Sequence, residues 1–247
     1  GRGRVMGGGG VEAVKELLSS RAGGWGIGGL VTHAQIQNKA GGPGFEALPE
    51  TASGIGDPQV RNRGTIGGNI AHADPASDWP AVLVAYGAII SVVGPNGRRE
   101  ITADDFFVDF FTTALAEDEI VERIRIPALN SPSNRGVGSA YAKMENPASR
   151  YSLVGAAAVV QVENGLCAKA GVAVGGLTPK ATRASAVEAA LTGKPLDQAT
   201  IEAAAAKIAD DLGDDVNGDL HASAEYRLAM APIFVARALT TAAARAK

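Results

Sequence analysis

The residues between Gly56 and Ser77 include a set whose types and spacing suit the binding of an anion. The glycine pair Gly67 and Gly68 lets successive backbone N–H groups converge on one negatively charged group. The hydroxyl, amide and guanidinium donors around this pair are Arg61, Arg63, Thr65 and Asn69. The pattern predicts a phosphate cradle, and the alternative is a tight turn between a strand and a helix. Neither a P-loop, with its lysine after the glycines, nor a dinucleotide fingerprint following a strand is present.

Other polar side chains have weaker patterns. Asp74 and Asp78 are four residues apart, but we expect Asp74 to brace the loop rather than to form an acid–base pair. His33 and His72 have no clustered carboxylates near them in the sequence, so no metal site is predicted. Cys167 is the only cysteine, which excludes an internal disulfide and the ligand set of an iron–sulfur cluster on this chain.

Composition narrows the class of protein. The 247 residues carry 23 basic and 26 acidic side chains, a net charge of −3, which argues against non-specific nucleic-acid binding. Hydrophobic residues make up 46% of the chain, enough for a substantial core. No apolar run approaches the ~20 residues that cross a bilayer, so no transmembrane segment is predicted. We expect a cytoplasmic protein; the alternative is peripheral association with the inner face of the membrane through partners.

The elements that must position the glycine pair are short. A strand is predicted over 25–31, a helix after the cap Thr32, and another helix over 45–55. Most of 56–77 has neither a helical nor a strand period, which predicts a long functional loop. Asp78 is then expected to cap the helix of residues 79–86. Residues 11–18 have the spacing of a short amphipathic helix.

The rest of the chain divides at a candidate linker, residues 128–135. Before it we expect a hairpin turning at Pro95-Asn96-Gly97 and a strand over 120–126. The predicted elements after it are strands at 138–145, 153–163 and 166–175, and helices at 183–191, 198–210 and 222–245. The fold class is α+β, with one domain over 1–130 and a second, smaller one over 136–247. In the second domain, helices cover a three-stranded antiparallel sheet.

The run from Ile55 to Asp78 resembles the second flavin motif of the FAD-binding medium subunit of molybdenum hydroxylases, a family that includes carbon monoxide dehydrogenase and xanthine dehydrogenase. The resemblance extends from about Gly24 to the C-terminus. Further ordered matches are 28–33, 105–107, 111–115, 118–120, 125–127, 141–144, 147–151 and 175–176. The stretch Pro-Ala-Ser-Arg-Tyr at 147–151 is most similar to the carbon monoxide dehydrogenase branch.

This resemblance implies a two-lobed FAD-binding domain followed by the smaller domain, with FAD between them. It implies an oxidoreductase subunit that passes electrons from [2Fe-2S] clusters to an external acceptor. The clusters would lie on a small iron–sulfur subunit and the molybdenum cofactor on a large subunit, with two heterotrimers forming a dimer. Alternatives are a structural or assembly subunit without flavin, a free-standing flavoprotein, and a medium subunit acting on xanthine or aromatic substrates.

The resemblance also implies roles for individual residues. Those matching the pyrophosphate region are Thr65, Ile66, Gly67, Gly68 and Asn69. Asp78 would hydrogen-bond the flavin or its ribityl chain, and Asp74 stands in the same motif. Val121 and Lys143 match positions lining the isoalloxazine, and Tyr151 matches an aromatic over one ring face. Taken without the family, Lys143 would be an exposed strand lysine and Tyr151 a core aromatic.

The N-terminus departs from the family pattern. Relatives carry a first flavin motif on a longer segment ahead of the part that matches Gly24, and only 23 residues precede Gly24 here. Gly8 and Gly9 are the candidate remnant of that motif. We expect residues to be missing from this end or incorrectly assigned.

Overall fold

A computed structural model describes residues 15, 17–19, 24–129 and 136–246. The first part of the chain is built on a five-stranded sheet in which every neighbouring pair is antiparallel. Its order is β1 (Leu17–Ser19), β2 (Trp25–Gly28), β7 (Ile120–Ile126), β3 (Ile89–Gly94) and β4 (Gly97–Thr102). The predicted hairpin is confirmed, because β3 pairs with β4 across the turn before Gly97.

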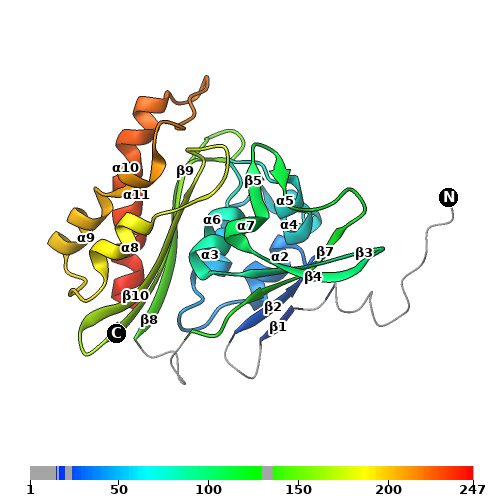
Figure 1. The fold of residues 1–247 in the computed structure, drawn as a ribbon, viewed down its shortest axis with the longest axis horizontal. Helices are drawn as coiled ribbons and strands as arrows, with labels where there is room; N and C mark the ends of the chain where they lie inside the picture. Colours follow the sequence, from blue (N-terminus) through cyan, green and yellow to red (C-terminus); the bar gives the residue numbers. More distant parts are fainter. Residues whose placement is uncertain (1–14, 16, 20–23, 130–135, 247) are drawn as a thin grey trace.

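Among the described residues before the second part, six helices and a small hairpin accompany this sheet (Figure 1). The helices are α2 (His33–Lys39), α3 (Ala47–Gly54), α4 (Pro58–Arg63), α5 (Ile66–His72), α6 (Trp79–Tyr86) and α7 (Ala103–Phe106). The hairpin pairs β5 (Phe107–Asp109) with β6 (Thr112–Thr113). The predicted cap of α2 is confirmed, since the hydroxyl of Thr32 accepts from the backbone N–H of Gln35 at 3.2 Å.

Two predictions for the first part are wrong. The long loop expected over 56–77 contains α4 and α5, which begin at side-chain caps made by Asp57 and Thr65. Helices of 6 and 7 residues are too short to show a helical period in sequence, so only their caps mark them. Leu17 and Leu18, expected in a helix, form β1 because they pair with β2. Residues 11–14 and 16 lie outside the described part.

The second part contains four strands rather than three. They are β8 (Val137–Glu145), β9 (Ser152–Glu163), β10 (Leu166–Gly175) and β11 (Thr182–Arg183), in the antiparallel order β11-β10-β9-β8. The helices are α8 (Ser185–Leu191), α9 (Gln198–Ala205), α10 (Ile208–Leu212) and α11 (Ala224–Arg245). The single helix expected over 198–210 is therefore two, and β11 is a two-residue edge strand too short for a sequence pattern.

The sheet of the second part lies between two helical layers (Figure 1). Helix α11 covers one face through β8 and β9, and α6 covers the other through β9 and β10. Side chains of β9 therefore serve two cores in alternation: Ala157 and Val159 contact the first core, Ala156 and Ala158 the second. Helix α6 is buried along its whole length, which explains its uninterrupted apolar sequence.

Helix α11 is the one described helix that is long and apolar enough to cross a membrane, judged by length and composition alone. In this fold it packs on the sheet and buries a face that includes Arg227, whose guanidinium donates to the carbonyl of Leu153 at 2.9 Å. This is the packing role predicted for it.

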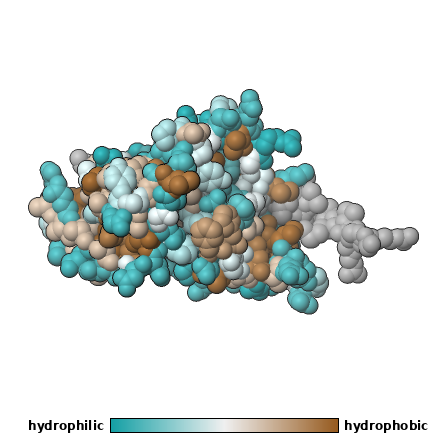
Figure 2. Space-filling model, turned by 90° about the horizontal axis from the view of Figure 1, so that it is seen from above, coloured by the Kyte–Doolittle hydropathy of each residue, from teal (hydrophilic) through white to brown (hydrophobic). Residues whose placement is uncertain are grey.

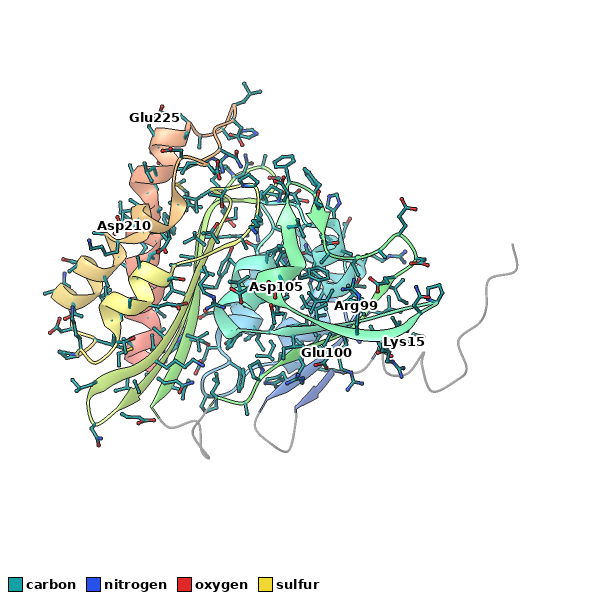
Figure 3. All side chains as sticks on the ribbon, in the orientation of Figure 1. Lys15, Arg99, Glu100, Asp105, Asp210 and Glu225 are labelled. Carbon is teal, nitrogen blue, oxygen red and sulfur yellow. The ribbon has the colours of Figure 1, made fainter. Side chains whose placement is uncertain are left out.

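The face seen in Figure 2 shows hydrophobic residues in separate groups among hydrophilic ones. Charged side chains such as Arg99 on β4 and Asp210 on α10 lie on opposite sides of the molecule (Figure 3).

Candidate functional site

A pocket of about 520 Å³ opens where α4, α5 and the start of α6 meet the loop that follows β8. Both parts of the chain contribute to it. Its lining residues are His33, Ile55, Gly56, Val60, Arg63, Gly64, Thr65, Gly68, Asn69, Ser77, Asp78, Ser149, Arg150 and Tyr151. The predicted cleft between the two parts therefore exists, and it contains Thr65, Gly68, Asn69, Asp78 and Tyr151 from the predicted set.

The glycine pair at the start of α5 has two separate roles. A Cβ at Gly68 would meet only the Thr65 hydroxyl, at 3.1 Å, so the chain itself leaves this backbone open toward the pocket. A Cβ at Gly67 would come within 2.5 Å of the carbonyl oxygen of Gly29, to which the Gly67 N–H donates at 2.9 Å. Gly67 and the buried Ile66 thus pack behind the pocket rather than lining it.

The carboxylate of Asp78 lies at the centre of a buried polar network. It accepts from the Tyr141 hydroxyl at 2.6 Å and from Lys143 Nζ at 3.0 Å. Burial raises the pKa of Asp78, and the Lys143 charge and the Tyr141 hydrogen bond oppose that rise. The predicted capping by Asp78 is wrong in one respect. Asp78 occupies the N-cap position of α6, but its side chain makes no capping hydrogen bond because both oxygens are engaged elsewhere.

Lys143 is a buried tie between the two parts of the chain. Besides Asp78, its ammonium donates to the carbonyls of Gly54 at 2.8 Å and Arg150 at 2.7 Å. The side chain is 9% exposed, so the alternative of an exposed strand lysine is wrong. Lys143 does not itself line the pocket; it holds Asp78 and the loop residue Arg150, which do.

Tyr151 and Asp74 lie at one edge of the pocket. Tyr151 is 46% exposed, so it is not a core aromatic, and its pKa is raised by burial and by the charges of Asp74 and Asp78. Asp74 accepts from the backbone N–H of Ala76 at 2.9 Å, the predicted bracing of the loop. It lines a neighbouring cavity of about 240 Å³, which shares Tyr151 with the main pocket.

Of the predicted residues, Val121 does not line the pocket, and two glycines lie outside the described part of the chain. Val121 is half-buried on β7 and packs against the first core, outside the lining of the pocket. Gly8 and Gly9 lie outside the described residues. Arg61, one of two guanidiniums considered for the anion, donates to the carbonyls of Ile55 and Gly56 and braces that turn, whereas Arg63 lines the pocket.

Several lining residues were not predicted from the sequence to bind a ligand, among them His33, which was considered only for a metal site. The Ser77 hydroxyl donates to Asn69 Oδ1 at 2.6 Å and so orients the Asn69 amide. The sequence feature that could have pointed to Ser77 is its position next to Asp78. Ile55 and Val60 supply apolar surface. His33 is 2% exposed, accepts at Nδ1 from Trp79 Nε1 at 3.1 Å, and has its pKa lowered to about 4 by burial and by Arg61. Because Trp79 is 46 positions away, no local pattern revealed this pair.

This arrangement suits a ligand with both a phosphate and a flat aromatic part. The predicted convergence of the two glycine N–H groups on an anion is not found, because the Gly67 N–H donates to Gly29 and the Gly68 N–H donates to the Thr65 hydroxyl at 3.2 Å. Gly68 instead leaves space beside the Thr65 hydroxyl and the Asn69 amide, and Arg63 adds positive charge. Ile55, Val60 and the half-exposed Tyr151 provide apolar and aromatic surface for a ring. The residues therefore fit a flavin nucleotide. Among the described residues no group of three His, Cys, Asp or Glu could hold a metal ion.

Comparison with known proteins agrees with this fit. Residues 9–129 match the family described as the FAD binding domain in molybdopterin dehydrogenase, and residues 139–242 match the CO dehydrogenase flavoprotein C-terminal domain. The carbon monoxide dehydrogenase medium chain of Hydrogenophaga pseudoflava is 40% identical over 200 residues, which cover 80% of this chain and 67% of that protein. The nicotine 6-hydroxylase medium subunit of Paenarthrobacter nicotinovorans is 36% identical over 220 residues, which cover 89% of this chain and 75% of that protein.

Solved structures show the same likeness. A structure of carbon monoxide dehydrogenase from Hydrogenophaga pseudoflava, lacking the Mo-pyranopterin moiety of its cofactor, aligns with a TM-score of 0.86 and 36% identity. The alignment covers 95% of this chain and 79% of that one. Quinoline 2-oxidoreductase from Pseudomonas putida 86 aligns with a TM-score of 0.84 and 28% identity. That alignment covers 95% of this chain and 80% of the quinoline 2-oxidoreductase chain. The chain belongs to the family of FAD-binding medium subunits of molybdenum hydroxylases, which are oxidoreductases.

Proposed function

We propose that this chain is the FAD-binding electron-transfer subunit of an aerobic carbon monoxide dehydrogenase, with FAD bound in the pocket between its two parts. The observation that carries the proposal is the backbone at Gly68, which the protein leaves open toward a pocket with phosphate donors and an aromatic wall. When bound, FAD supplies the ability to accept electrons singly and to release them as a pair.

The chain's own residues bind and orient this group. Thr65, Gly68 and Asn69 hold the pyrophosphate, with Gly67 and Ile66 fixing the start of α5 behind them. Asp78 would hydrogen-bond the flavin or its ribityl chain, Lys143 pairs with that carboxylate, and Tyr151 would cover one face of the ring. Val121 on β7 and Asp74 in the loop after α5 are the remaining residues that we propose to contact the cofactor. Support comes from the shared pocket lining and from the Asp78–Lys143 distance of 3.0 Å.

We also propose the partners. Medium chains are, by name, parts of larger complexes, and the relatives here carry that name. A small subunit with [2Fe-2S] clusters delivers electrons, a large subunit carries the molybdenum cofactor, and two such heterotrimers form a dimer. An external acceptor removes the electrons, in the cytoplasm or at the inner face of the membrane. We propose two domains, residues 1–130 and 136–247; the two family matches, ending at 129 and beginning at 139, support this division.

The substrate assignment has a competitor. The nicotine 6-hydroxylase medium subunit is 36% identical, against 40% for the carbon monoxide dehydrogenase chain. Purified complex should reduce a dye with carbon monoxide and not with nicotine or xanthine. Dye reduction by nicotine or xanthine alone would assign the chain to a hydroxylase of aromatic substrates.

The cofactor assignment is tested with Gly68→Val in the complex. We expect the variant to lose FAD, because the added side chain occupies the space of the pyrophosphate while meeting little of the protein itself. Released flavin is measured by absorption and chromatography after denaturation, with circular dichroism confirming the fold. Full FAD content in Gly68→Val would contradict the phosphate cradle. Wild-type complex that contains its clusters but no flavin would favour a structural subunit.

A further inference from the structure

His33 occupies an unusual place for a histidine, at the start of α2 and in the wall of the proposed flavin pocket. Its backbone N–H donates to the carbonyl of Gly64 at 3.0 Å, and its neighbour Thr32 forms a β-bridge with Thr65. The first turn of α2 is thereby fastened to the segment that starts α5. The imidazole is 2% exposed and still lines the pocket, so the little surface that it retains faces the ligand space.

The Trp79 indole fixes which ring nitrogen of His33 carries the proton. An indole N–H can only donate, and it lies 3.1 Å from Nδ1, so Nδ1 accepts and carries no hydrogen. In a neutral imidazole the single hydrogen is then on Nε2. A second proton on Nδ1 would set two N–H groups against each other. The charged groups around the pocket are Arg61, Arg63, Asp78 and Arg150, and the charge of Arg61 together with burial lowers the pKa of His33.

The Nε2 edge of the ring is turned to Gly64 and the pocket. A Cβ at Gly64 would come within 2.9 Å of both Cδ2 and Nε2, so a glycine is needed there to keep this edge uncovered. Among the described residues the hydrogen bond shown for the ring is the one that Nδ1 accepts from Trp79. Nε2 is not among the buried atoms without a partner, so it keeps a small exposed surface, at the pocket that His33 lines. The Nε2–H is therefore available to a ligand in the pocket, where a few fixed polar groups in an otherwise apolar wall set the orientation of what binds.

We propose that His33 is a fixed hydrogen-bond donor to the bound flavin cofactor, through Nε2–H to an oxygen on the pyrophosphate side of the pocket. The inference rests on the proposed function. His33 binds as a neutral donor, selecting an acceptor oxygen rather than a cation or another donor. Thr65 and Gly68 hold the cofactor from α5, and His33 holds it from α2, so both helices are locked together when the ligand is bound.

Two substitutions separate this role from a structural one. His33→Asn keeps an amide oxygen near the Nδ1 position to accept from Trp79, but it has no group at the Nε2 position. His33→Gln places an amide N–H₂ near the Nε2 position, but it loses the acceptor near Nδ1. We expect His33→Asn to keep its stability and to bind FAD about tenfold to a hundredfold more weakly. His33→Gln should unfold more easily and keep FAD affinity within a few-fold of wild type.

The measurement is a fluorescence titration of FAD into deflavinated complex, paired with thermal unfolding of the same samples. FAD affinity that follows stability in both variants, with His33→Gln the weaker binder, would overturn the inference, as would wild-type affinity in His33→Asn. Wild-type complex that binds no FAD would instead contradict the proposed function. The same titration with riboflavin distinguishes the acceptor: an equal loss in His33→Asn assigns a ribityl hydroxyl, and an unchanged affinity assigns a phosphate oxygen.

A second readout is the pH profile of FAD affinity. The wild-type profile should show no His33 titration between pH 7 and 5, because the proton cannot be added at Nδ1. Trp79→Phe removes the indole donor, so His33 can take a second proton there, and FAD affinity should change with pH in this interval. A wild-type profile that bends near the ordinary histidine pKa of about 6.5 would contradict the fixed neutral donor.

Discussion

At the scale of single residues, the environment of a side chain determines its chemistry here more than its type does. Two glycines adjacent in sequence have different surroundings, because a Cβ at Gly67 would meet the backbone of Gly29 and one at Gly68 would meet only the Thr65 hydroxyl. Two ionisable groups near the pocket are likewise set by their partners. His33 is neutral against Trp79, and Asp78 is paired with Lys143. The neutral state of His33 and the pairing of Asp78 with Lys143 each predict a measurable effect on the stability of the fold.

The pKa of His33 predicts a loss of stability in mild acid. The folded-state pKa of about 4 lies below the unfolded value of about 6.5, so below pH 6.5 the unfolded chain binds a proton that the folded chain does not. The free energy of unfolding should therefore fall by about 2 kcal/mol between pH 7 and pH 5. Urea unfolding across this range measures it. His33→Asn should abolish most of the slope, and an unchanged slope in that variant would place the titration elsewhere.

The buried ion pair predicts a large effect of removing one partner. Lys143→Met leaves the Asp78 carboxylate without its cation and two carbonyls without their donor, and we expect a loss of about 3–5 kcal/mol in unfolding free energy. Adding Asp78→Asn to Lys143→Met should recover part of that loss, because no uncompensated charge then remains. Denaturant titration of the single and double variants measures this coupling. Additive losses in the double variant would show that the two groups act independently.

At the scale of elements, the position of α5 depends on a backbone-to-backbone contact. The N–H of Gly67 donates to the carbonyl of Gly29, and Gly29 in turn donates from its N–H to the carbonyl of Glu122 on β7. Glycine at both crossing points lets α5 approach the β2–β7 pair closely. The sheet thereby fixes where residues 65–69 lie relative to the pocket, although neither Gly29 nor Gly67 lines the pocket.

This contact predicts unequal effects of two alanine substitutions. Gly67→Ala should destabilise the protein by about 1–3 kcal/mol, because its methyl group must displace the Gly29 backbone. Gly68→Ala should change stability by less than about 1 kcal/mol, because that position is exposed and its methyl group would meet only the Thr65 hydroxyl, a side-chain atom, at 3.1 Å. Thermal unfolding of the two flavin-free variants measures the difference. Equal destabilisation would contradict the separate roles of the two glycines.

At the scale of the whole molecule, the two parts of the chain share one central layer. Helix α6 belongs to the first part and packs on β9 and β10 of the second. The hydroxyl of Tyr86 on α6 donates to the carbonyl of Gly44 at 3.0 Å and lies 2.8 Å from the Ser139 hydroxyl of β8. Arg245 at the end of α11 also pairs with Glu50 of α3. The pocket between the parts is held open by this shared layer rather than by either part alone.

A shared layer predicts cooperative unfolding. We expect one transition in differential scanning calorimetry, because β9 contributes side chains to both cores and α6, which belongs to the first core, packs on β9 and β10. Gly171→Val tests the coupling, since a side chain there would collide with the carbonyl of Ala85 on α6. The single transition should move to lower temperature, with a loss of about 1–3 kcal/mol. Two transitions, only one of them shifted, would show that the parts unfold independently.

The sequence by itself determined the features that depend on neighbours along the chain. The hairpin turns at Asn96-Gly97 and Asn164-Gly165, the strands beside them and the cap of α2 were all predicted correctly. Local backbone geometry and side-chain capping act over a few residues, so a short window of sequence contains their causes.

Only the tertiary structure decided the features that depend on distant partners. The helices α4 and α5 were hidden by their shortness, the partners of Asp78 come from β8, and the open edge of His33 exists because Trp79 and Gly64 surround it. Gly67 and Gly68 look alike in sequence and differ only in what lies opposite them. The physical reason is the same in each case: burial, pairing and free space are properties of the packed chain, which no local pattern contains.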